Sequence, residues 1–160
     1  MSTAPRLSDL VRGEVVGTRT VTFTRADLVA YAGASGDRNP IHWSPTFAEH
    51  VGLPGVIAHG MLTMGAAVQL VSDWAGDPGA VVDYQTRFTG MVPVPATGEV
   101  ALEVVATVGA IDESAGTARV DLAAVVDGEK VLGRARATLA LPRRTQDVEA
   151  DAADVEGATV

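Results

Sequence analysis

Two side chains that can exchange protons lie close together in one short segment, Gly-Asp-Arg-Asn-Pro-Ile-His at residues 36–42. Asp37 supplies a carboxylate, and His42 supplies an imidazole, the side chain that ordinarily changes charge near neutral pH. Gly36 permits a backbone turn that a side chain would hinder, and Pro40 restricts the approach to His42. A loop constrained in this way can hold both groups in mutual reach, so we interpret the pair as a candidate for general acid–base chemistry.

Helical signals flank this loop on both sides. Thr-Arg-Ala-Asp at 24–27 has the pattern of a capping box and predicts a helix that ends at Gly33 or Gly36. Ser-Pro at 44–45 predicts the cap and first turn of a short helix that ends at His50. The loop is therefore expected to connect two helices.

A longer helix is predicted over residues 60–74, where apolar residues occupy almost the whole circumference and small residues cluster at 65–67. A helix that is apolar all round is typical of a buried position, so we expect this one at the centre of the fold. Gly-Asp-Pro-Gly at 76–79 is expected to end it.

The hydrophobic period changes to two after this helix, which predicts strands. The expected strands cover residues 82–88, 100–108, 120–126 and about 130–141, with hairpin turns at 112–116 and 127–128 and an earlier strand at roughly 18–23. We expect Tyr84 and Phe88 in the core of the sheet. Together these elements predict an α+β domain of the hot-dog type, in which an antiparallel sheet of four or five strands wraps around the long helix.

Composition excludes several classes of function. The 160 residues are enough for one domain with a single core, which we place at residues 1–142, followed by an acidic, disordered tail at 143–160. A net charge of −8 argues against a nucleic-acid partner, and the lack of cysteine removes disulfides and thiolate nucleophiles. We expect no signal peptide and no membrane partner, and hence a cytoplasmic protein.

The segment 36–42 resembles the hydratase-2 motif of MaoC-like R-specific enoyl-CoA hydratases, and Ile-Ala-His-Gly-Met at 57–61 is similar to the start of that family's central helix. The resemblance covers about residues 7–141, and several stretches are most similar to an actinobacterial branch that includes the catalytic subunit of a two-subunit R-3-hydroxyacyl-ACP dehydratase. It implies a hydro-lyase that hydrates 2-enoyl thioesters or dehydrates R-3-hydroxyacyl thioesters in fatty acid metabolism.

The resemblance also implies roles for matching residues. Asp37 and His42 would be the catalytic pair, the backbone amide of Gly60 would stabilise the thioester oxygen, and Asn39 would help to order the loop. Removal of a proton from C2 pushes negative charge onto that oxygen, and the first N–H groups of a helix can stabilise it. We assign the C2 proton to His42, and the water or leaving hydroxyl to Asp37 and His42 together. Ser44 stands where many relatives carry an acidic residue, and we interpret it as a helix cap.

Substrate contacts are expected from Asn39, His59 and Met61. For His59, a role in packing or capping the central helix is an equally good interpretation, and Met61 either belongs to the core or borders an acyl tunnel. His50 is expected to be solvated. The spacing of the three histidines matches no standard zinc pattern, so we expect no metal ion and no cofactor.

Two other functions are weighed against this one. A hot-dog thioesterase would direct water at the carbonyl carbon, but the Asp-x-Asn-Pro-x-His loop argues against it. A non-catalytic subunit of a dehydratase heterodimer typically lacks the Asp and His that this sequence retains. The expected substrate is carried by CoA or by acyl carrier protein, and a single hot-dog domain is expected to form a homodimer or a heterodimer with a second hot-dog subunit.

Overall fold

The computed structural model describes residues 4–142, so the tail interpreted at 143–160 lies outside the described residues. The longer helices are α1 (Arg25–Ser35), α2 (Pro45–His50) and α3 (Gly60–Ala75). The strands are β1 (Val15–Phe23), β2 (Val81–Phe88), β3 (Val100–Asp112), β4 (Thr117–Val126) and β5 (Glu129–Ala140). Short 3₁₀ turns lie at Leu7–Asp9, Pro40–His42 and Pro78–Ala80.

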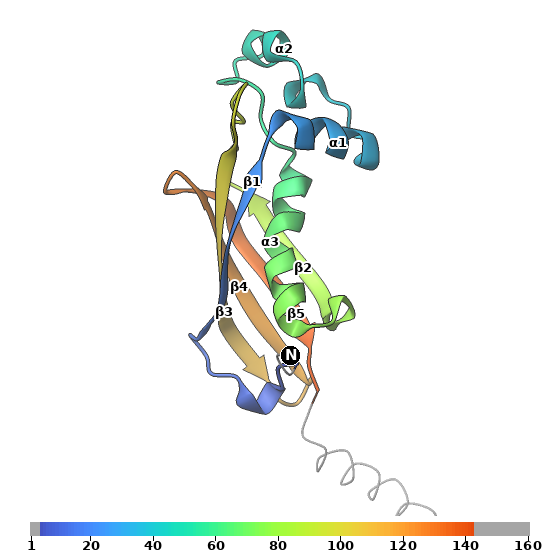
Figure 1. Ribbon diagram of the computed structural model, residues 1–160. Helices are drawn as coiled ribbons and strands as arrows, with labels where there is room; N and C mark the ends of the chain where they lie inside the picture. The colour runs from blue at the N-terminus through green and yellow to red at the C-terminus, as the bar shows by residue number, and fades with distance from the viewer. Residues whose placement is uncertain (1–3, 143–160) are drawn as a thin grey trace, which may run out of the picture.

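The five strands form one antiparallel sheet in the order β1-β3-β4-β5-β2. Helix α3 runs along one face of it, with β1 and β3 on one side and β2 and β5 on the other (Figure 1). Helices α1 and α2 lie beyond the N-terminal end of α3 (Figure 1). The predicted α+β arrangement of a hot-dog fold, a sheet around one long helix, is confirmed.

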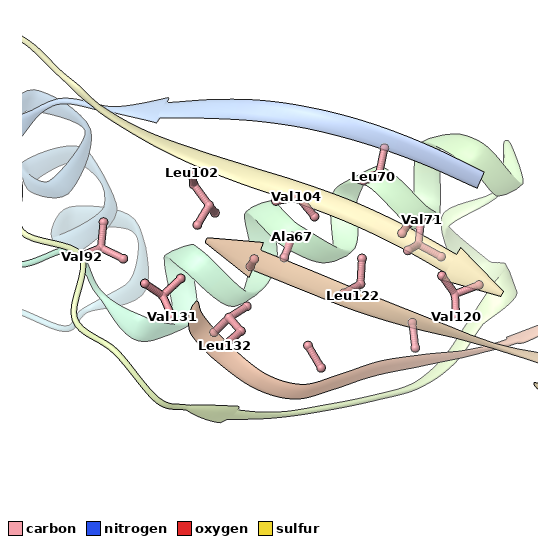
Figure 2. Packing of buried hydrophobic residues seen from close by; sticks show 14 of the residues in the cluster. Ala67, Leu70, Val71, Val92, Leu102, Val104, Val120, Leu122, Val131 and Leu132 are labelled. Carbon is pink, nitrogen blue, oxygen red and sulfur yellow. The ribbon is translucent and has the colours of Figure 1, made fainter. Parts of the chain in front are cut away.

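The core lies between α3 and the sheet. Figure 2 shows Ala67, Leu70 and Val71 of α3 facing residues of three strands and of the chain before them, namely Val92, Leu102, Val104, Val120, Leu122, Val131 and Leu132. All of these are buried. Burial of a leucine or valine side chain contributes about 1.5–3 kcal/mol, so this cluster fixes the position of α3 on the sheet.

Helix α3 is buried on one side only, so the prediction that it is buried all round is wrong. Met61 is 58% exposed, and Gly65, Gln69 and Asp73 are exposed as well. These residues recur every four positions and therefore form one stripe along the helix. The sheet covers the opposite side of α3, which leaves an apolar end of the stripe at Met61 and Gly65 uncovered.

The prediction of a core position is also wrong for Phe88, which is 53% exposed. Phe88 ends β2, an edge strand, so no neighbouring strand covers its far side. Tyr84 is half-buried and packs against the core, as predicted. Its hydroxyl is buried with no hydrogen-bond partner among residues 4–142, and this burial raises the pKa of Tyr84 to about 12.

Local signals fix the helix ends near the loop. The Thr24 hydroxyl accepts a hydrogen bond from the Asp27 N–H (3.3 Å), and the Asp27 carboxylate accepts one from the Thr24 N–H (2.7 Å). This capping box starts α1, and Gly36, with φ +78°, ends it in the left-handed conformation that favours glycine. The Ser44 hydroxyl caps α2 by accepting from the Phe47 N–H.

None of the helices within the described part of the chain has the length and apolar character that a membrane crossing needs.

Candidate active site

The loop after α1 is held by hydrogen bonds within itself. The Asp37 carboxylate accepts a hydrogen bond from the Asn39 N–H (3.1 Å), and the Asn39 side-chain oxygen accepts one from the Ile41 N–H (3.2 Å). The second bond caps the 3₁₀ turn that carries His42. Asn39 therefore orders the turn through its own side chain. It does not line the cavity described below, and its contact with substrate stays a prediction.

Asp37 and His42 face one another across this turn. The Asp37 carboxylate is 3.8 Å from Nε2 of His42, and the two side chains are 52% and 8% exposed. Nδ1 of His42 lies 2.8 Å from the Ile57 carbonyl oxygen. A carbonyl only accepts hydrogen bonds, so Nδ1 carries the proton in the neutral ring and Nε2 presents a lone pair toward Asp37. The carboxylate is beyond hydrogen-bond distance, so a hydroxyl or water can contact both groups.

His42 forms part of the wall of a cavity of about 190 Å³. The wall also contains Gly60 and Thr63 of α3, and the remaining lining residues are apolar or glycine: Ile57, Ala58, Phe88, Gly90, Met91, Val92, Val131 and Leu132. His42 is the one ionisable residue in this wall. The cavity thus combines an apolar interior with a single proton-accepting nitrogen.

Gly60 brings the N-terminus of α3 to this cavity. It is the first residue of the helix, and no side chain of the preceding cap residue bonds to the free N–H groups. A Cβ atom at this position would lie 3.1 Å from the Phe88 ring, tighter than usual packing. Glycine therefore keeps the backbone accessible, and the N-terminal end of α3, which carries the positive end of the helix dipole, lies at the cavity wall.

His59 lies directly behind His42 and is 1% exposed. The two rings stack with centroids 3.8 Å apart and an interplanar angle of 22°. Nε2 of His59 is 3.1 Å from the Asp37 carbonyl oxygen, and the Tyr31 ring of α1 packs against the imidazole at an interplanar angle of 60°. His59 does not line the cavity, so of the two interpretations offered by the sequence, the geometry supports packing, and the side chain makes no cap. Burial, the largest cause, and the neighbouring His42 lower the pKa of His59.

Met61 lies on the exposed stripe of α3 and is absent from the cavity wall, so its contact with an acyl chain stays a prediction. His50 is exposed on α2, as predicted. Three groups at the site were not predicted from the sequence: Thr63, Phe88 and the Ile57 carbonyl. Thr63 lies nearly one helical turn after Gly60, which was a usable signal. The position of Phe88 depends on strand pairing, which no local pattern shows.

A metal site is poorly supported by the ligand geometry. Asp37, His42 and His59 offer ligand atoms within 4.8 Å of one another. Ligands of one tetrahedral zinc ion lie about 3.4 Å apart and point at a common centre. Two stacked rings direct their nitrogens side by side, and one nitrogen of each already contacts a backbone carbonyl.

Comparisons with known proteins show which family and which fold this chain shares. The family model described as "MaoC like domain" matches residues 9–126. The chain is 47% identical to 3-hydroxyacyl-thioester dehydratase X of Mycobacterium tuberculosis over 75 residues, which cover 47% of this chain and 26% of that protein. It spans only 4% of the fatty acid synthase beta subunit TOXC of Cochliobolus carbonum, which it also matches.

Solved structures show the same fold over most of the chain. A structure titled "MaoC-like dehydratase" has a TM-score of 0.84 and 37% identity, over 87% of this chain and 43% of that one. The unliganded R-hydratase PhaJ1 from Pseudomonas aeruginosa has a TM-score of 0.71 and 25% identity, over 87% of this chain and 86% of that one.

Proposed function

The chain belongs to the MaoC like domain family, and from this premise we propose that it is a hydro-lyase acting on acyl thioesters. It would add water to the 2,3-double bond of 2-enoyl thioesters and remove water from R-3-hydroxyacyl thioesters, carried by CoA or by acyl carrier protein. One observation supports this most directly: Nε2 of His42 faces the Asp37 carboxylate beside a cavity that also receives the free N-terminus of α3. Relatives named as a 3-hydroxyacyl-thioester dehydratase and an R-hydratase fit the same chemistry.

In the dehydration direction, the lone pair on Nε2 of His42 takes the proton from C2. The electrons of the C–H bond move toward the thioester carbonyl, and the Gly60 N–H stabilises the negative charge on its oxygen. The C3–O bond then breaks, and the proton held by His42 passes to the departing hydroxyl, so that water leaves. Asp37 binds this hydroxyl beside His42. Hydration follows the same steps in reverse.

The cavity makes this assignment chemically reasonable. An apolar wall excludes water from the acyl chain and strengthens the interaction of the oxyanion with the helix terminus, because the local dielectric is low. The Ile57 carbonyl holds the His42 proton on Nδ1, so Nε2 is the nitrogen that is free to act as a base. No covalent intermediate is needed, which agrees with a sequence that has no cysteine.

The first test is hydration of crotonyl-CoA by the purified chain. We expect the enoyl-thioester absorbance to fall and the product to be R-3-hydroxybutyryl-CoA in chiral analysis. The same assay is repeated with a longer enoyl thioester and with a co-expressed hot-dog partner. Release of free thiol, measured with a thiol reagent, would instead indicate a thioesterase. If the folded chain binds the acyl thioester but converts it under none of these conditions, the result would indicate a non-catalytic binding subunit.

We propose further that the chain pairs with a second hot-dog unit, either a copy of itself or a different subunit. The exposed end of the α3 stripe at Met61 and Gly65 offers an apolar helix face, and the adjacent edge strand β2 exposes Val82 and Phe88. The chain also covers less than half of the matched MaoC-like dehydratase, which leaves room there for a second unit. A cytoplasmic location stays a prediction from the sequence.

The pairing predicts a sensitive position on α3. Met61→Glu places a charge on the exposed apolar stripe and is expected to shift the chain from dimer to monomer in light scattering. Val29→Glu is the matched control, because Val29 is 59% exposed, close to the 58% of Met61, but lies on α1. A wild-type chain that remains monomeric, alone and with a co-expressed hot-dog partner, would contradict the pairing.

A further inference from the structure

We propose that His59 is a positioning residue: it fixes the His42 ring and the Asp37 backbone from behind and makes no contact with substrate. The inference rests on the proposed function, because it assigns His59 a part in the same acid–base site. Its basis is geometric. His59 is 1% exposed, stacks on His42 and contacts the Asp37 carbonyl oxygen, yet it is absent from the cavity wall.

The contact with Asp37 fixes the tautomer of His59. The Asp37 carbonyl can only accept, so Nε2 of His59 carries a proton and donates it at 3.1 Å. The Asp37 N–H in turn donates to the Ser35 hydroxyl at 3.2 Å. The backbone N–H and carbonyl of Asp37 are therefore both hydrogen-bonded. These bonds hold the main chain that carries the carboxylate in one position. A half-exposed carboxylate gains its position from this backbone anchoring rather than from burial.

The stacking contact with His59 restrains the face of the His42 ring. The Ile57 carbonyl holds the edge of the His42 ring at Nδ1, and the His59 ring covers one of its faces at 3.8 Å. Together these contacts restrict rotation of the ring about its bond to Cβ. Nε2 consequently stays directed toward Asp37, in a residue that lines the cavity. A misplacement of about 1 Å at a reacting group can cost about 100-fold in rate, so such restriction matters for catalysis.

The surroundings of His59 also keep it neutral. The groups that face it are the Tyr31 ring of α1, the Asp37 carbonyl and carboxylate, and the His42 ring. Its Nδ1 is buried and has no hydrogen-bond partner within residues 4–142, so a proton there would have no acceptor. When His42 carries the substrate proton, a second charge on the stacked ring would be repelled. The neutral ring instead presents its π face to the imidazolium.

Nitrogen-15 NMR of the wild-type chain tests the charge and tautomer directly. The sequence has only three histidines, so His42→Gln and His50→Gln variants are enough to assign the signals. We expect His59 to remain neutral, protonated on Nε2, from about pH 8 down to about pH 6, the range in which free histidine becomes charged. Protonation of His59 in that range, or a neutral ring protonated on Nδ1, would overturn the proposal. This readout does not depend on enzymatic activity.

Two substitutions separate the contacts of His59 in the kinetic test. His59→Phe retains a ring that can stack on His42 but loses the donor to Asp37, whereas His59→Gln retains a donor and loses the stack. We expect each variant to lower kcat for crotonyl-CoA at least about tenfold with KM changed less than about twofold, because ground-state binding is untouched. The His42 nitrogen signals are expected to shift in His59→Gln. Exposed His50→Gln is the control and should leave both constants unchanged.

The outcomes distinguish this proposal from the proposed function. A raised KM with unchanged kcat would make His59 a substrate contact, and unchanged constants in both variants would make it packing alone; either result overturns positioning. If Asp37→Asn abolishes hydration while both His59 variants remain fully active, the proposed hydro-lyase function is supported and the positioning role of His59 is wrong. If the wild-type chain lacks activity, the NMR experiment still decides the charge and tautomer that the proposal requires.

Discussion

Replacement of His42 by glutamine is expected to lower kcat for hydration of crotonyl-CoA by roughly 10²–10⁴-fold, the usual contribution of a general acid–base group. Glutamine can retain a donor to the Ile57 carbonyl, which now fixes Nδ1 at 2.8 Å, but it cannot accept the C2 proton. Loss of activity would therefore reflect the missing base rather than a collapsed loop. The measurement is the initial rate of absorbance loss, with circular dichroism to verify the fold.

Asp37→Asn completes this test at the second member of the pair. The substitution keeps the backbone carbonyl that His59 contacts and the size of the side chain, while it removes the negative charge beside Nε2 of His42. We expect kcat to fall strongly here as well, since the water or leaving hydroxyl loses a charged acceptor and the amide keeps only one accepting oxygen. His50→Gln, at the exposed histidine, is the matched control. Activity above about a tenth of wild type in either site variant would contradict the assigned roles.

The second large effect is expected at Gly60, where proline would remove the one backbone N–H assigned to the thioester oxygen. Proline suits the first residue of a helix, and His59 before it has φ −61° and ψ 131°, the extended geometry that precedes proline. We therefore expect α3 to form normally in Gly60→Pro. Loss of one such donor costs about 10²–10³-fold in kcat, and the same loss is expected here.

Gly60→Ala is the control for crowding at this position. Both substitutions add a Cβ atom, which would lie 3.1 Å from the Phe88 ring. Because Phe88 is 53% exposed, the ring can move away at small cost. The alanine variant keeps the N–H and should retain most of the activity, with a similar melting temperature in both variants. Equal kcat in the proline and alanine variants would show that the amide of Gly60 does not stabilise the oxyanion.

Much of the fold could be predicted because its signals act over a few residues. The capping box at Thr24 and Asp27 and the Ser44 cap each join groups within three positions of one another, so the sequence alone located the starts of α1 and α2. The turn at Asp127 and Gly128, with φ of +50° and +82°, was also predictable, because two adjacent residue types favour it. The change of hydrophobic period from helix to strand is likewise a property of neighbouring residues, and it predicted all four strands after α3.

The candidate site was predicted in part for the same reason. Asp37 and His42 are five positions apart, and the intervening turn brings their side chains to 3.8 Å. Their chemistry, and the similarity of the loop to a known motif, could be recognised without any long-range contact. The tautomer of His42 could not, because it depends on the Ile57 carbonyl fifteen positions away.

The sequence by itself therefore determined the element types, their caps and turns, and which loop carries the acid–base pair. Tertiary structure alone decided that His59 lies behind His42 rather than in the cavity, that α3 leaves Met61 uncovered, and that Phe88 lies over Gly60 at an exposed sheet edge. Each of these depends on which surfaces meet when distant segments pack together. Burial and partner choice are set by that packing, which residue type and local spacing do not encode.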